Sequence, residues 1–360
     1  MPWIESRFAI AWLLPLGTAV AALWAPWAAW AFMLGFMGLV ALLERVPALQ
    51  RSPAPSGHTA WHRACLLLHL PLQFGLQALG VAIAVAQPAD AWGAAAVVAL
   101  GLGVGGVSGS QGITFAHELG HSKRRLDRVA AWLLMGSVLY AHFMVEHYRG
   151  HHARAATHDD PASARRGESL WRFLPRTLAG SWASAWRLEA ARLQQRRQGW
   201  ARSPLLAATA VQGLLLVALA AAFGPWALLF GVVQAAQAVL LLETINYIEH
   251  YGLQRRRDAT GRAEPFGLAR RPLADQRHHR QPPAPFRPPH ARLEALRRAA
   301  GPARAAAAHG LRRLPAAGQR ATLVVRGHGA AAGPPGCYTA TGALMAAWCW
   351  YSSTSKSSYW

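Results

Sequence analysis

Three short segments of the sequence combine histidine with glutamate at spacings that suit metal binding. They read HELGH at residues 117–121, EHYRGHH at 146–152 and NYIEHYGL at 246–253. A spacing of four residues places two imidazoles on one helix face, one turn apart. The candidate metal ligands are therefore His117, His121, His147, His151, His152 and His250. The adjacent Glu118, Glu146 and Glu249 either orient imidazole N–H groups or bind metal themselves, and the sequence leaves both roles open.

The number and type of these side chains restrict the metal. Neutral imidazoles suit iron, copper or zinc rather than calcium or magnesium, and more than four converging histidines indicate two ions. A zinc protease also uses HExxH, but it needs one further ligand and an open position, not two further clusters. A histidine such as His250, taken alone at a helix end, is more often a hydrogen-bonding residue than a ligand. The three segments together favour a metal centre.

The apolar composition indicates that membrane helices carry these segments. Of 360 residues, 53% are hydrophobic and 15% are charged, and a helix needs ~20 consecutive apolar residues to cross the hydrocarbon core. The sequence predicts an all-α integral membrane protein with six transmembrane helices. The apolar runs lie at 8–24, 27–43, 64–86, 92–114, 204–223 and 226–247. A seventh run at 129–145 is shorter and ambiguous.

The basic residues predict the orientation of the chain. The formal net charge is +21, but much of the arginine follows Gln254 and the rest lies in loops, so we do not expect nucleic-acid binding. The loops after 43 and 114 and the segment 154–202 are basic, which predicts that they are cytoplasmic. All three histidine segments then lie on the cytoplasmic side, and 129–145 must be a buried or re-entrant helix. Three cysteines without a CxxC pair suggest neither disulfides nor a zinc site.

HELGHS, EHYRGHH and NYIEHYGL, in this order, resemble the bacterial alkane 1-monooxygenases. Membrane desaturases and xylene monooxygenases share the first two boxes more loosely, whereas NYIEHYGL is typical of alkane hydroxylases. The segments THDDPASA at 157–164 and GES at 167–169 are similar as well. The resemblance covers roughly residues 5–269.

The resemblance implies a multi-pass protein of the bacterial inner membrane, in contact with its lipids, with a di-iron site facing the cytoplasm. It implies two non-haem iron ions held by the six histidines named above. The implied reaction is terminal hydroxylation of medium-chain n-alkanes to primary alcohols with O2. The implied electron donor is rubredoxin, reduced by rubredoxin reductase with NADH.

The sequence departs from this family after Ala269. The family has a further box of the form LQRHSDHH that supplies three more histidines, and no such box stands here, although His278, His279 and His290 lie nearby. Reading residues 280–290 and 308–318 one base later permits sequences similar to the missing box and the stretch after it. We therefore predict a hydroxylase domain at 1–269 and a frameshifted or disordered basic tail at 270–360. As printed, the chain is predicted to have little or no activity.

Two alternatives stay open at this point. One is a related enzyme, either a desaturase or a hydroxylase of xylene or sterols. The other is a non-catalytic, degenerate remnant of the family.

Overall fold

The computed structural model describes residues 7–43, 45 and 60–255, and these residues are helical apart from turns and an isolated bridge at Gln254. The long helices are α2 (Leu13–Trp24), α3 (Pro26–Leu43), α4 (Ala60–Val85), α5 (Ala91–Val107), α7 (Arg125–Ser137), α10 (Leu170–Gln195), α11 (Pro204–Phe223) and α12 (Pro225–His250). The shorter segments are η1 (Arg7–Trp12), η2 (Ser108–Gly112), α6 (Ile113–Gly120), α8 (Phe143–Val145), η3 (Glu146–His151), α9 (His152–Arg154) and η4 (Trp200–Arg202). The all-helical class predicted from the sequence is confirmed for this part of the chain. The tail predicted at 270–360 lies outside the described residues.

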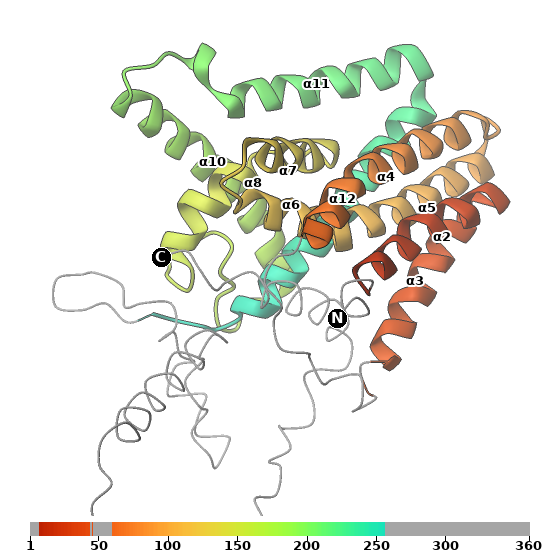
Figure 1. Cartoon of the computed structure of the whole chain (residues 1–360), viewed down its shortest axis with the longest axis horizontal. Helices are drawn as coiled ribbons and strands as arrows, with labels where there is room; N and C mark the ends of the chain where they lie inside the picture. Colours follow the sequence, from red (N-terminus) through yellow and green to blue (C-terminus); the bar gives the residue numbers. More distant parts are fainter. Residues whose placement is uncertain (1–6, 44, 46–59, 256–360) are drawn as a thin grey trace, which may run out of the picture.

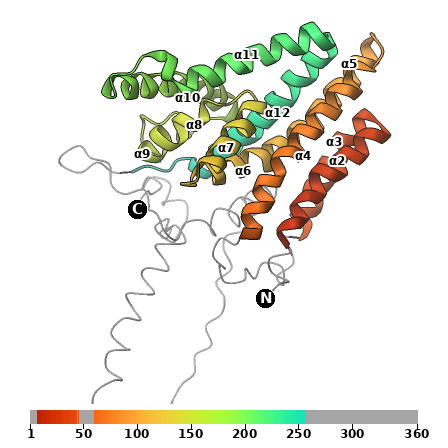
Figure 2. The same ribbon diagram turned by 45° about the horizontal axis from the view of Figure 1, so that its top comes forward.

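Five helical segments are long and apolar enough to cross a membrane. They are Pro26–Leu43, Ala60–Val85, Ala91–Gly120, Pro204–Phe223 and Pro225–His250. Each coincides with an apolar run of the sequence. The first run forms a shorter apolar helix, Ala9–Trp24. Figures 1 and 2 show α2, α3, α4, α5 and α12 running side by side.

Helix α5 lies between α3 and α12, and its glycines allow close approach to both. A Cβ at Gly103 would lie 2.6 Å from the carbonyl carbon of Ala29 on α3. A Cβ at Gly105 would lie 2.4 Å from the backbone oxygen of Gln234 on α12. Small residues at such positions are how membrane helices gain van der Waals contact, because lipid gives helix pairs no hydrophobic driving force. This packing holds α12 against the helix that continues into the first histidine segment.

The ambiguous run at 129–145 does not form one helix. Helix α7 ends at Ser137, and its 13 residues span ~20 Å, which is shorter than the ~30 Å hydrocarbon core. Helix ends leave carbonyl groups without intrahelical donors, and the Ser137 carbonyl accepts from the Gln234 amide of α12 at 2.9 Å. Leu139 then turns the chain with a φ of 57°. The run is thus broken in two, and α7 is buried on one face while Val129 and Leu133 are exposed. That the run does not cross the membrane stays a prediction.

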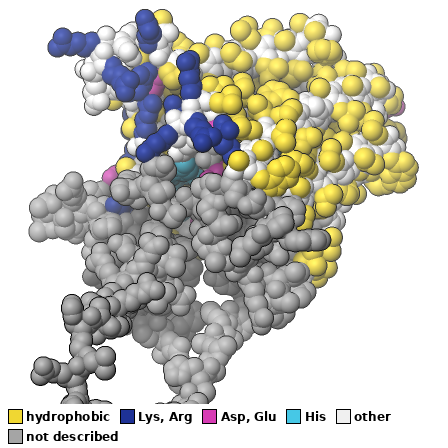
Figure 3. Space-filling view, in the orientation of Figure 1, with side chains coloured by type: hydrophobic (Ala, Val, Ile, Leu, Met, Phe, Trp, Pro, Cys, Tyr) yellow, Lys and Arg dark blue, Asp and Glu magenta, His cyan; other side chains and the backbone are white. Residues whose placement is uncertain are grey.

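Charge and apolar surface lie at different parts of the molecule. Figure 3 shows hydrophobic side chains over the helices that could cross a membrane, while Lys and Arg gather at the other side, next to a visible histidine. Leu214, Val217 and Val20 are all more than 60% exposed. Exposed apolar area of this extent indicates a lipid-facing surface.

Candidate metal centre

Two π-helical turns, η2 and η3, position the histidine segments. Helix α5 continues through η2 into α6, which carries His117 near its end. The second turn, η3, itself contains His147 and His151. A π-helix forms i to i+5 hydrogen bonds and widens the turn, and such turns often mark functional sites. Both turns therefore change the direction of side chains relative to an ordinary α-helix.

Four histidines converge closely enough that they could hold a metal ion. They are His117, His121, His147 and His152, whose ligand atoms all lie within 4.8 Å of one another; we call them the four-histidine cluster. The Nε2 atoms of His117 and His121 are 3.3 Å apart, and those of His147 and His152 are 3.0 Å apart. Imidazole nitrogens ~2.1 Å from one ion would stand ~3.0–3.4 Å apart at angles of 90–109°. The side chains present fit a metal ion.

The geometry of EHYRGHH agrees with the sequence-based prediction that His147 and His151 share a face. Their rings stack, with centroids 5.2 Å apart. The Nε2 atom of His147, however, lies 3.0 Å from that of His152, five residues later, because η3 is a π-helical turn. The ring of His151 also lies close to that of His250, with centroids 4.8 Å apart. The ligand roles of these residues stay a prediction.

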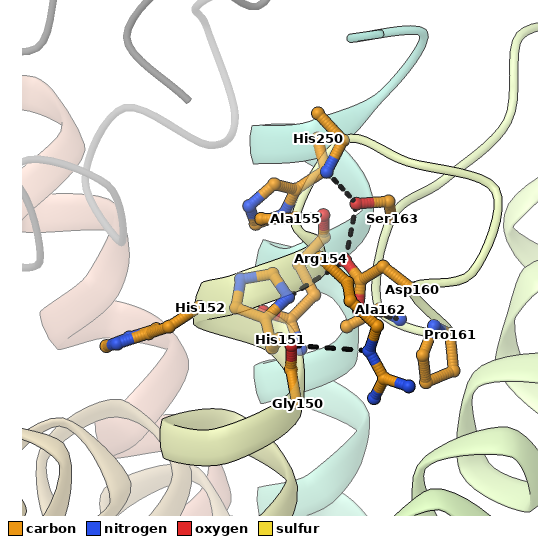
Figure 4. Close-up of polar contacts among 12 residues, drawn as sticks. Gly150, His151, His152, Arg154, Ala155, Asp160, Pro161, Ala162, Ser163 and His250 are labelled. Atoms are coloured by element: carbon orange, nitrogen blue, oxygen red, sulfur yellow. Dashed lines mark hydrogen bonds and ion pairs between the residues drawn. The ribbon is translucent and has the colours of Figure 1, made fainter. Parts of the chain in front are cut away.

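His151 and His250 form a second group, called here the histidine pair. Figure 4 shows the two rings near each other, with His152 pointing away to the other side. His151 donates from Nδ1 to the carboxylate of Asp160 at 2.9 Å, and His250 donates from Nδ1 to the Asn246 carbonyl at 2.9 Å. With Nδ1 protonated, a neutral ring carries its lone pair on Nε2. Such acceptors orient metal-binding histidines.

Asp160 is itself held rigidly in the loop before α10. It is 1% exposed, and it accepts hydrogen bonds from the Ser163 hydroxyl and from the backbone N–H of Ala162. The Ser163 hydroxyl in turn accepts from the backbone N–H of Ala156 at 2.7 Å. This loop therefore fixes the direction of His151 before any metal binds.

The three candidate glutamates do not join the four-histidine cluster. Among the described residues, the group with converging ligand atoms contains histidines alone. Glu146 is buried and forms an ion pair with Arg154 at 2.9 Å. Glu118 is buried and Glu249 is half-buried. The structure places all three beside histidines, and the choice between an orienting and a ligating role stays a prediction.

Tyr148 packs among the histidines of the cluster. Its hydroxyl donates to the His117 carbonyl at 2.7 Å, and its ring centroid is 4.8 Å from that of His121 and 5.8 Å from that of His152. A Cβ at Gly120 would lie 2.1 Å from the Tyr148 hydroxyl. Tyr148 therefore links the first histidine segment to the second, and Gly120 leaves room for it.

The surroundings shift the pKa values of His147 and His151 in opposite directions. Burial, together with the neighbouring histidines of the cluster, lowers the pKa of His147 well below its usual value. Burial alone would lower the pKa of His151 too, but the Asp160 carboxylate raises it above its usual value. A neutral imidazole is the form that binds a metal ion. His147 is therefore ready to coordinate at neutral pH.

The contacts of several residues around the site could not be predicted from the sequence. Asp160, Tyr148 and Asn246 lie within the conspicuous segments, but nothing in their spacing predicts hydrogen bonds to His151, His117 or His250. His142 lines a pocket with His147 and His151. Its position five residues before His147 is the only signal that could have drawn attention to it.

Comparison with known proteins agrees with this geometry. The family model described as fatty acid desaturase matches residues 90–315, more than half of the chain. The chain is 45% identical to alkane 1-monooxygenase 2 of Pseudomonas aeruginosa over 168 residues, which is 45% of this chain and 44% of that protein. It is 34% identical to alkane 1-monooxygenase 1 of Alcanivorax borkumensis over 235 residues, 63% of this chain and 57% of that protein.

A more distant relative is the xylene/toluene monooxygenase hydroxylase component of Pseudomonas putida, 29% identical over 198 residues, 52% of each chain. The chain spans less than half the length of the first relative, 44%. The family match covers both π-helical turns and all six candidate histidines. The chain belongs to the fatty acid desaturase family, and within it resembles the alkane 1-monooxygenases.

Proposed function

We propose that this protein hydroxylates the terminal carbon of medium-chain n-alkanes with O2 and two electrons, giving primary alcohols and water. The observation that carries the proposal is the convergence of His117, His121, His147 and His152 at the end of apolar helices. The similarity to proteins named alkane 1-monooxygenase supports the substrate class. An alkane has no polar group, so an apolar enclosure within the membrane suits it.

Iron is the proposed metal, with two ions in the intact protein. Bound iron would supply the activation of O2, and the protein supplies ligand geometry and a dry cavity. The four-histidine cluster would hold one ion, and the histidine pair would provide two ligands for the other. Asp160, the Asn246 carbonyl and Tyr148 hold these rings in place.

The proposed topology has six transmembrane helices, with the site facing the cytoplasm from the bacterial inner membrane. The five long apolar helices and the shorter Ala9–Trp24 support the count. The separation of basic and apolar surfaces supports the orientation, since cytoplasmic loops carry an excess of Lys and Arg.

Rubredoxin, reduced by its reductase and NADH, is the proposed electron donor. An acidic electron carrier would dock on exposed cationic side chains near the site. Arg165, Arg166 and Arg172 are exposed. Arg176, in contrast, binds both oxygens of Glu168 at 2.7 and 2.8 Å. We therefore assign Arg176 to the structure of the loop and the exposed arginines to docking.

The segment after Ala269 limits the activity of the chain as printed. We propose that residues 1–269 form the hydroxylase domain and that 270–360 result from a shifted reading frame. Without the family's further histidine box, the histidine pair lacks ligands for its ion. The printed chain is then expected to bind about one iron and to turn over little alkane.

The test compares the full printed chain with a version whose frame is restored after Ala269. Both are purified in lipid nanodiscs, iron per chain is measured, and octane is supplied with rubredoxin, rubredoxin reductase and NADH. We expect 1-octanol from the restored version only, together with a higher iron content. Equal iron content and no 1-octanol from either version would contradict the proposal.

A second candidate activity is desaturation of an acyl chain or hydroxylation of xylene. The family match and the more distant xylene relative favour testing it. The same preparations supplied with an acyl substrate or xylene would reveal it as a different product.

A further inference from the structure

His142 is a buried histidine that the site described above does not use. It lies in the turn between α7 and α8 and is 5% exposed, and among the described residues neither of its ring nitrogens has a hydrogen-bond partner. Its ring is held between Tyr140 and Trp182, with centroids 4.2 and 5.1 Å away. Buried polar groups in folded proteins nearly always have a partner. The missing partner of His142 therefore points to a bound molecule.

The pocket beside His142 adjoins the metal ligands. His142 lines it together with His147 of the four-histidine cluster and His151 of the histidine pair. Ser181 of α10 and Asn246 of α12 also line it. A molecule in this pocket is next to both groups of histidines at once.

The acidic groups of the pocket already have partners. Glu243 accepts from the Tyr140 hydroxyl and from the Thr177 hydroxyl, both at 2.8 Å. Glu146 is paired with Arg154. His142 is then the wall residue with hydrogen-bonding capacity left on both ring nitrogens.

We propose that His142 binds a hydroxyl group in this pocket, either that of a water molecule or that of a primary alcohol. A neutral imidazole has one N–H donor and one acceptor nitrogen, and a hydroxyl has both functions as well. An alkane has neither. The part concerning the alcohol rests on the proposed hydroxylation, because an alcohol is formed beside His147 and His151 only if that reaction occurs there.

The consequence is a preference of the site for product over substrate. The hydroxyl gains a hydrogen bond at His142 that the alkane cannot form. Loss of that bond should weaken alcohol binding roughly five- to tenfold, the usual effect of one hydrogen bond, and leave alkane binding unchanged. A free 1-alkanol should thus compete with the alkane more strongly than chain length alone predicts.

The experiment measures retention of radiolabelled 1-octanol and octane on the full chain in nanodiscs, relative to empty nanodiscs of the same lipid. It needs no turnover. The variants are His142→Phe, which removes both nitrogens, and His142→Gln, which keeps a donor and an acceptor. The matched control is His69→Phe, the same change at a buried histidine of α4 outside the pocket. Melting temperatures identify any variant that fails to fold, and a high-resolution map of the wild-type protein accompanies them.

Reduced 1-octanol retention in His142→Phe, restored by His142→Gln and unaffected in His69→Phe, supports an alcohol hydroxyl. Unchanged retention with a density within hydrogen-bond distance of the His142 ring supports water. Unchanged retention without such a density overturns the proposal. If the protein hydroxylates no alkane, 1-octanol retention still reports on His142 separately, so the two proposals fail independently.

Discussion

The four-histidine cluster and the histidine pair are built on different principles. In the cluster the Nε2 atoms converge on one another, and a tyrosine packs among the rings. In the pair each ring is oriented by a hydrogen bond from its Nδ1 atom, to Asp160 for His151 and to the Asn246 carbonyl for His250. The cluster offers four ligand atoms that could hold one ion, whereas the pair offers two oriented rings.

This difference separates two ways to organise a metal site. A cluster whose ligands come from the end of α6 and from η3 and α9 depends mainly on the ligands themselves. A pair oriented by outer acceptors depends on those acceptors, because they set the tautomer and direction of the rings. The substitutions below test whether the two groups respond independently.

The largest expected effect follows from removing one cluster ligand. His121→Ala takes away one of four nitrogens, and since His121 is exposed the fold should tolerate the change. We expect metal affinity of the cluster to fall by more than ~100-fold, beyond the 10–100-fold typical of outer-acceptor changes. Cobalt(II) titration followed by visible absorption measures it. The control is His158→Ala, an exposed histidine outside the cluster, which should bind like the wild type; an equal loss there would contradict the assignment.

A smaller and selective effect is expected from Asp160→Asn. The amide has one oxygen and cannot replace both carboxylate oxygens, of which one accepts from His151 and Ser163 and the other from the backbone N–H of Ala162. We expect the ion held by the histidine pair to bind ~10–100-fold more weakly, with no change in the cluster. The frame-restored protein is titrated with cobalt(II), and the two binding steps are compared. A parallel loss in both steps would show that the two groups act as one unit.

Tyr148→Phe should have a modest effect confined to the cluster. It removes the hydrogen bond to the His117 carbonyl, which contributes ~1 kcal/mol, or about fivefold in affinity. The cobalt(II) absorption of the cluster should also change, because the angle between the two helical segments is less fixed. Tyr247→Phe is the matched control, since its hydroxyl donates to the Glu168 carbonyl at the same 2.7 Å but away from the cluster. Identical spectra for wild type and Tyr148→Phe would contradict a positioning role.

The sequence predicts the helical architecture well, because each apolar run has to satisfy its backbone within one helix. It predicts the gathering of the four cluster histidines for a similar reason, since each box lies at the end of an apolar run. The i+4 spacing predicts that His147 and His151 share a face, and their rings stack in the structure. It does not predict the close approach of the His147 and His152 Nε2 atoms, because nothing in EHYRGHH distinguishes a π-helical turn from an α-helical one.

The groups that accept hydrogen bonds from the His151 and His250 rings could not be predicted from the sequence either. Asp160 reaches His151 only through the turn that Ser163 and Ala156 stabilise, and the partner of His250 is a backbone carbonyl, which every residue has. His142 depends on the break after Leu139, where the structure interrupts a run that looks uniformly apolar. Tertiary contacts determine these positions, and the local sequence pattern does not predict them.

The smallest effect on the metal is expected from Glu189, which anchors η3 as a whole. Glu189 of α10 is fully buried and binds Arg149, which lies between the cluster and pair residues of η3. Burial alone would raise the pKa of Glu189, but hydrogen bonds from Arg192, Ser203 and Arg149 lower it to about 2 from the usual 4.5. Because its pKa is lowered, the stabilisation that the Glu189 carboxylate contributes is fully present above about pH 4.5 and is lost as the pH falls towards 2.

In Glu189→Gln we therefore expect a lower melting temperature at pH 7, a weaker decline of melting temperature below pH 4.5, and unchanged cobalt(II) binding at pH 7. Thermal unfolding from pH 7 to pH 3 measures this. The control is Glu168→Gln, because the Glu168 carboxylate pairs with Arg176 of α10 and not with a residue of η3. If Glu189→Gln weakened metal binding at one of the two histidine groups more than at the other, η3 would not be a rigid unit. Any independence of the cluster and the pair would then come from the flexibility of η3, and not from the different residues that hold their rings.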